Sequence, residues 1–195
     1  MRSAARSALV YGALALVGLS AGLAGCTPES RNTLPEKDRI APDERLIGRW
    51  HATVDGADYV AEVTRADALT LNVALVETLP VGKRPVTRTG YRAGVYTVGS
   101  RTILAAQDVE PTPGNWRFAV MLFSGDDRVT LMFMDEHYVF MEVNRAAFPG
   151  TIRTNDPMFP DVVITASSTD LEAFIRSASE GRMFTVPFGP FERQP

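Results

Sequence analysis

From Leu46 onward, apolar and polar residues alternate along much of the chain. One face of the first alternating run carries Trp50, Ala52 and Val54. A period of two is typical of a strand with one buried face. The pair Asp55-Gly56 that follows this run is a strong hairpin signal. We therefore expect two antiparallel strands to begin the folded part of the chain.

The same rhythm continues for about another hundred residues. Further β-prone runs lie at 59–64, 69–76, 87–98, 102–107, 116–123, 129–134 and 137–143. The segments between them contain Gly, Pro, Asn, Asp and Ser, the residues that form turns. This spacing predicts a mainly β fold, an antiparallel up-and-down barrel or sandwich of about eight strands. The pair Asp135-Glu136 is interpreted as a hairpin tip.

Near the end of the chain the period changes from two to that of a helix. Thr169 and Glu172 have the spacing of a capping box, and Gly181 suits the residue just after a helix. An apolar stripe is formed by Leu171, Phe174, Ile175 and Ala178. We expect one C-terminal α-helix over 169–180, packed on the sheet. Residues 183–191 are expected to form an apolar tail along the domain.

One late strand is apolar on both faces. Val129, Leu131 and Phe133 alternate with the second set, Thr130, Met132 and Met134. In a barrel, one set would face the interior and the other would lie under the helix and the tail. The methionines are interpreted as core filler, with an adaptable apolar binding site as the alternative.

The first 25 residues form a separate unit. A basic start is followed by an apolar run, which ends in Leu23-Ala24-Gly25-Cys26. This stretch resembles the lipobox of bacterial lipoproteins. The resemblance implies that residues 1–25 are a signal peptide, that Cys26 carries acyl chains, and that the chain is cut just before it. An uncleaved membrane anchor is the alternative, and either places the domain outside the cytoplasm.

The lipobox also implies a location. The protein would be lipid-anchored in the cell envelope through acyl chains on Cys26. The residue after Cys26 is Thr27. An aspartate at this position would resemble an inner-membrane retention signal. The periplasmic face of the outer membrane is therefore favoured. Residues 26–45 contain three prolines and no apolar periodicity, so we expect a flexible tether before one domain at 46–195.

Composition excludes several kinds of chemistry. Cys26 is the only cysteine, so no disulfide and no thiol catalysis are expected. The net charge is −3, and it becomes more negative without Arg2 and Arg6, which argues against nucleic acid as a partner. The two histidines, His51 and His137, do not make a metal site. No nucleophile motif or phosphate-binding loop occurs, so we expect no enzyme, no catalytic residue and no cofactor.

Gly48-Arg49-Trp50 opens the first strand. Together with the strand count and the late helix, it resembles the start of a lipocalin. That resemblance implies an eight-stranded up-and-down barrel in which the tryptophan closes one end. It also implies a carrier of a small hydrophobic ligand or lipid.

Two functions therefore remain open. Short strands enclose little volume, which favours a non-catalytic interaction or structural module that binds an envelope protein. The alternative is a lipocalin-like carrier with an apolar cavity. Its expected lining is Trp50, Leu71, Val73, Leu75, Met132 and Phe133. A filled core and a cavity wall have the same binary pattern, so the alternation does not separate the two.

Overall fold

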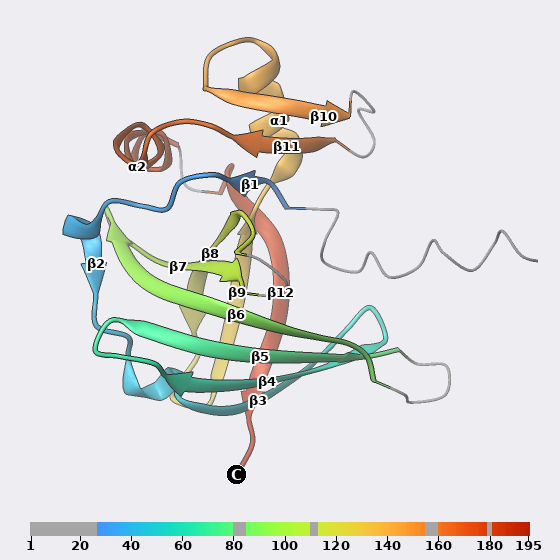
Figure 1. Cartoon of the computed structure of the whole chain (residues 1–195). Helices are drawn as coiled ribbons and strands as arrows, with labels where there is room; N and C mark the ends of the chain where they lie inside the picture. The colour runs from blue at the N-terminus through green and yellow to red at the C-terminus, as the bar shows by residue number, and fades with distance from the viewer. Residues whose placement is uncertain (1–26, 80–84, 110–112, 155–159, 179–180) are drawn as a thin grey trace, which may run out of the picture.

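The fold is a closed antiparallel β-barrel with a second layer packed against it (Figure 1). The computed structural model describes residues 27–79, 85–109, 113–154, 160–178 and 181–195. The expected signal peptide at 1–25 and the lipidated Cys26 lie outside these residues.

Eight strands form the barrel. They are β3 (Gly48–Val54), β4 (Ala57–Arg65), β5 (Thr70–Thr78), β6 (Pro85–Val98), β7 (Arg101–Asp108), β8 (Trp116–Phe123), β9 (Arg128–Met134) and β12 (Phe184–Arg193). Each strand from β3 to β9 pairs with the next one in sequence, and β12 pairs with both β9 and β3. The predicted mainly β, antiparallel fold is confirmed. It is a barrel and not a sandwich.

The strand that closes the barrel, β12, is where the expected apolar tail at 183–191 should have been. This expectation was wrong for a physical reason. Pro187 and Pro190 lack the amide proton of a ladder hydrogen bond, and prolines in a run usually argue against a central strand. Here the pairing with β9 shifts register between Phe188 and Phe191, which accommodates Pro190, whereas Pro187 stands opposite Met132 in the regular part of the ladder.

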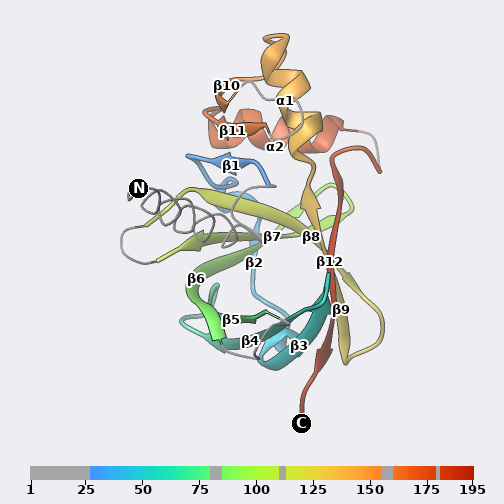
Figure 2. The same ribbon diagram turned by 90° about the vertical axis from the view of Figure 1, so that its right-hand side faces the viewer.

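The second layer, which we call the cap, lies over one side of the barrel (Figures 1 and 2). It consists of β1 (Glu29–Ser30), α1 (Glu136–Asn144), β10 (Gly150–Thr154), β11 (Asp161–Ile164) and α2 (Ser168–Ser177). The short strand β1 joins the two layers, because it pairs with β8 of the barrel and with β11 of the cap.

Helix α1 replaces the strand expected at 137–143. Asp135 is its N-cap, and the Asp135 carboxylate accepts a hydrogen bond of 2.9 Å from the amide of Tyr138. Val139 and Phe140 are buried in the apolar cluster that α1 shares with the barrel wall. The residues of the expected hairpin tip therefore start a helix. The β-branched and aromatic content of this segment had favoured a strand, but its capping residue and its packing decide for a helix.

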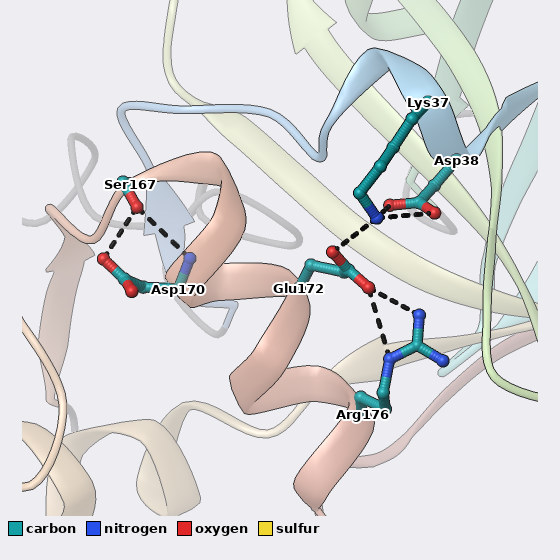
Figure 3. Close-up of polar contacts among 6 residues, drawn as sticks. All are labelled: Lys37, Asp38, Ser167, Asp170, Glu172 and Arg176. Atoms are coloured by element: carbon teal, nitrogen blue, oxygen red, sulfur yellow. Dashed lines mark hydrogen bonds and ion pairs between the residues drawn. The ribbon is translucent and has the colours of Figure 1, made fainter.

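Helix α2 is close to the expected range of 169–180 but starts one residue earlier and has a different N-cap (Figure 3). Ser167 is the N-cap, and its hydroxyl accepts a 3.2 Å hydrogen bond from the amide of Asp170. The expected capping box of Thr169 and Glu172 is therefore wrong. The Glu172 carboxylate instead lies 2.8 Å from the ammonium of Lys37.

The segment at 27–45 also differs from expectation. It folds onto the domain as strand β1, the short 3-10 helix η1 (Glu36–Asp38), strand β2 (Arg39–Ile40) and the start of the 3-10 helix η2 (Glu44–Leu46). Strand β2 pairs with β6. Ser30 and Leu34 are 0% and 1% exposed. A flexible tether over the described part of 26–45 is therefore wrong. A few well-placed anchors hold a segment that has no periodic apolar face.

Two apolar cores result from this arrangement. The barrel core lies inside the barrel, and the cap core lies between the barrel wall and the cap. Strand β9 separates them. Val129, Leu131 and Phe133 belong to the barrel interior, whereas Met132 and Met134 pack on the cap side. The predicted two-sided burial of this strand is confirmed, with the cap in place of the expected tail.

Candidate ligand-binding cavity

One end of the barrel interior is hollow. A cavity of about 190 Å³ opens there. Strands β4 to β9 and β12 contribute most of its wall, and Thr27 contributes from the N-terminal segment. The apolar part of the wall is made by Ala61, Val73, Leu75, Leu104, Ala106, Ala119, Leu131, Phe133, Phe188 and Phe191. Such a concave, mostly apolar site is the usual form of a small-molecule site.

The opposite end of the barrel is packed. Trp50 is 2% exposed there, and its indole N–H donates a 2.9 Å hydrogen bond to the carbonyl of Leu46. The Arg193 guanidinium lies 5.5 Å from the centre of the Trp50 ring. Gly48 has a φ of +133°, which an L side chain rarely adopts, and a Cβ on it would lie 3.3 Å from Arg193. Large side chains and this glycine together close the end.

An aromatic cluster forms one wall of the cavity. Phe188 contacts three other rings in edge-on or tilted geometry, at centroid distances of 4.9 Å to Tyr59, 5.8 Å to Phe133 and 5.1 Å to Phe191. Aromatic side chains bury large areas and hold fixed orientations. This wall is therefore rigid and apolar.

Polar groups gather at the mouth. The hydroxyl of Tyr59 donates a 3.0 Å hydrogen bond to Glu77. Burial raises the pKa of Tyr59 to about 12, and the Glu77 carboxylate adds to this shift. Tyr59 therefore remains a hydrogen-bond donor at any physiological pH. Thr87, Thr89 and Tyr91 of β6 complete this side of the rim.

The cation at the mouth is Arg117. Its side chain is 15% exposed and lies 2.7 Å from Glu29 and 3.0 Å from Asp108. Burial alone would lower the pKa of Arg117, but the hydrogen bond and charge of Asp108, together with Glu29, raise it above its usual value. The two carboxylates neutralise this cation, so a strongly anionic ligand would have to compete with them.

Thr27 stands at the same mouth. It is 8% exposed, and its hydroxyl oxygen is buried without a hydrogen-bond partner. Leaving a hydroxyl unpaired in a buried place costs about 1–3 kcal/mol. A ligand with a polar group at the mouth would satisfy it.

The structure separates the six residues expected to line a cavity. Val73, Leu75 and Phe133 do line it. Trp50 and Leu71 lie in the packed end, and Met132 faces the cap. Trp50 is therefore not a lining residue, although it pairs across the sheet with Ala61 of the cavity wall.

Sequence reasoning missed the aromatic wall and the polar mouth. Phe188 and Phe191 were overlooked because the prolines of β12 hid a strand. Arg117 was overlooked because it sits at an inward position of an otherwise apolar run. Charged residues at inward positions, Arg117 on β8 and Glu77 on β5, were the signals that pointed to this mouth.

Other kinds of site were sought in the described part of the chain. No three acidic or histidine side chains there are grouped so that they would hold a metal ion. None of the helices described is long and apolar enough to cross a membrane.

Comparison with known proteins adds no assignment. No family model matches the sequence, and neither the curated proteins nor the solved structures gave a significant match.

Proposed function

We propose that this chain is a lipoprotein of the bacterial envelope whose barrel carries a hydrophobic ligand. The observation that supports the carrier is the apolar cavity of about 190 Å³ at one end of the barrel. It favours the lipocalin-like carrier over the interaction module, which the short strands alone had favoured. The Gly48-Arg49-Trp50 start and the closed eight-stranded barrel agree with that choice.

The volume limits what is carried. An engineered protein cavity of about 150 Å³ holds a benzene ring, whereas pockets for whole drug-sized molecules are about 300–1,000 Å³. The present cavity therefore takes one ring or one stretch of acyl chain. The rest of the ligand would remain at the mouth.

The mouth indicates the other half of the ligand. The Thr27 hydroxyl has no partner there, and Arg117 is paired with acids, while the Tyr59 hydroxyl already donates to Glu77 and can still accept a hydrogen bond. A neutral or zwitterionic polar group suits this rim better than a bare anion, because Arg117 is neutralised. The proposed ligand is an amphiphile with a single inserted apolar chain.

The anchor in this proposal is Cys26. Its support is the lipobox sequence that precedes it. Cys26→Ser is expected to abolish acylation and to release the protein from the membrane fraction, as measured by labelled fatty acid and fractionation. An acylated Cys26→Ser protein would contradict the anchor, whatever the barrel binds.

Ligand binding is tested with a cavity-filling substitution. Ala106 lines the cavity, so Ala106→Trp should fill it and reduce binding of a hydrophobic fluorophore at least several-fold. Ala74 is a matched control, because it is half-buried on strand β5 of the same barrel but is absent from the cavity lining, unlike its neighbours Val73 and Leu75. Ala74→Trp should bind as the unchanged protein does.

Three results would decide the question. Displacement of the fluorophore by long-chain fatty acids or lysophospholipids would identify the ligand as an amphiphile. Equal binding by both tryptophan variants would place the fluorophore outside the cavity and contradict the carrier. No binding by any form would return the interaction module to first place.

A further inference from the structure

We infer that the mouth of the cavity lies against the bilayer that holds the lipid on Cys26. The inference rests on the proposed anchor and goes beyond it, because an anchor alone does not orient a domain. It follows from the position of Thr27, which is both a wall residue of the cavity and the first residue after Cys26. The partner of this surface is a lipid membrane.

The start of the described chain is fixed to the barrel mouth. Thr27 is buried there. Two residues later, Glu29 accepts hydrogen bonds of 2.7 Å from Arg117 and 2.9 Å from Asn115. Arg117 belongs to the cavity wall, so the N-terminal segment and the mouth share one ion pair.

The backbone adds a second restraint. Ser30 pairs with Trp116 of the barrel and with Ile164 of the cap, and the amide of Arg31 donates a 3.0 Å hydrogen bond to the carbonyl of Ile164. Ser30 is 0% exposed. A segment paired on both sides does not act as a flexible spacer.

The remaining length between lipid and barrel is one residue. Consecutive Cα atoms are about 3.8 Å apart, so an acylated Cys26 holds its lipid within one residue of the cavity wall. A tether over 26–45 would have left the barrel free to turn. Because residues 27–45 are packed on the domain instead, the barrel loses that freedom, and its mouth lies close to the lipid headgroups.

This placement suits the chemistry of the mouth. The unpaired hydroxyl of Thr27 is at the point where the chain meets the lipid surface. Ester and phosphate oxygens of lipids accept hydrogen bonds from hydroxyl groups. The cavity is thus apolar inside and has a buried hydrogen-bond donor at its entrance. This order matches that of an amphiphile in a bilayer, whose apolar chain would enter first while its polar group stays at the entrance.

The orientation is tested on the acylated full-length protein in vesicles of phosphatidylethanolamine and phosphatidylglycerol. A fluorophore is attached to one introduced cysteine, and headgroup-labelled nitroxide lipids quench it. Arg88→Cys reports from the mouth, because Arg88 is exposed next to the wall residue Thr87. Asp126→Cys is the control, since its side chain is 89% exposed in the turn at the other end of β8 from Arg117. Acylation blocks the thiol of Cys26, which keeps the label at the introduced site.

Quenching at residue 88 is expected to exceed quenching at residue 126 several-fold. Insertion of about 20 Gly and Ser residues between Cys26 and Thr27, which span about 25 Å on average, should remove that difference while acylation and vesicle binding persist. Equal quenching at both sites of the acylated protein without the insertion would overturn the orientation and leave the anchor standing. A chain without acyl groups would overturn both.

Discussion

The barrel interior and the cap core are made from the same kinds of apolar residue, yet the described barrel contains a cavity, whereas the buried residues of the cap core are fully enclosed. In the cap core Val139, Leu171 and Ile175 are 0% exposed, because helices α1 and α2 pack on the outside of the barrel wall. In the barrel, the strands' own side chains must fill the space. Where these are large, as at Trp50 and Met121, the interior is closed.

The wall of the hollow part combines large aromatic rings with small side chains. Ala61, Ala106 and Ala119 are the small residues of this wall. A closed barrel of eight strands has an interior just wide enough for side chains to fill, and small residues leave part of it empty. The comparison teaches that the alternation itself does not separate a core from a cavity, because both regions have it and only the fit between the inward side chains differs.

Matched leucines give the largest test of this difference. Leu171→Ala in the cap core is expected to lower the free energy of unfolding by about 2–5 kcal/mol, the range for a fully buried leucine. Leu75→Ala in the cavity wall should cost less, about 1 kcal/mol, because Leu75 is half-buried beside existing empty space. Chemical denaturation of both variants measures the two values. Equal losses would mean that the cavity is filled and packed like the cap.

A second test uses a buried acid of the cap. Glu136 is 9% exposed, and burial raises its pKa to about 7. A backbone hydrogen bond from Val162 acts in the opposite direction, whereas the negative charges of Asp161, Glu29 and Asp135 raise the pKa further. Its folded-state pKa lies above the unfolded value of 4.5, so the folded chain binds the extra proton between these values. Stability therefore falls as pH rises from about 4.5 to 7.

Glu136→Gln should remove this loss. The variant is expected to be more stable than the unchanged protein by about 1–2 kcal/mol at pH 8 and little different at pH 4, by denaturation at each pH. Glu172 gives a control of opposite sign, since the hydrogen bonds from Lys37 and then Arg176 lower its pKa. Glu172→Gln should cost stability at neutral pH, and that cost should vanish as the pH falls below about 4.5. The same pH trend in both variants would contradict this assignment.

How far the sequence predicted the molecule differs between these regions. The barrel strands β3 to β9 were predicted because each half-buried strand records its environment in its own alternation. Strand β12 was missed because prolines interrupt its pairing. The cap was missed in part because α1 and the segment at 27–45 owe their burial to partners far away in the chain, such as Leu34 packed in the cap core.

The candidate site was predicted only in outline. Val73, Leu75 and Phe133 were expected from strand parity, and they line the cavity. Parity names the face of a strand but not the depth along the barrel, so Trp50 and Leu71 were placed in the cavity with them. Thr27 had no signal of its own, because its role depends on the ion pair between Glu29 and Arg117 two residues later.

The smallest test concerns how the cap helix begins. The Ser167 hydroxyl accepts a hydrogen bond from the amide of Asp170 and donates one of 2.7 Å to the Asp170 carboxylate. Ser167→Ala should therefore lower the free energy of unfolding by about 1 kcal/mol. Thr169 lies inside the helix and not at the cap, so Thr169→Ala should change stability by only a few tenths of a kcal/mol, if at all. Thermal melts of the two variants measure the difference. A larger loss from Thr169→Ala would restore the capping box expected from the sequence, and with it a helix start two residues later than the one described.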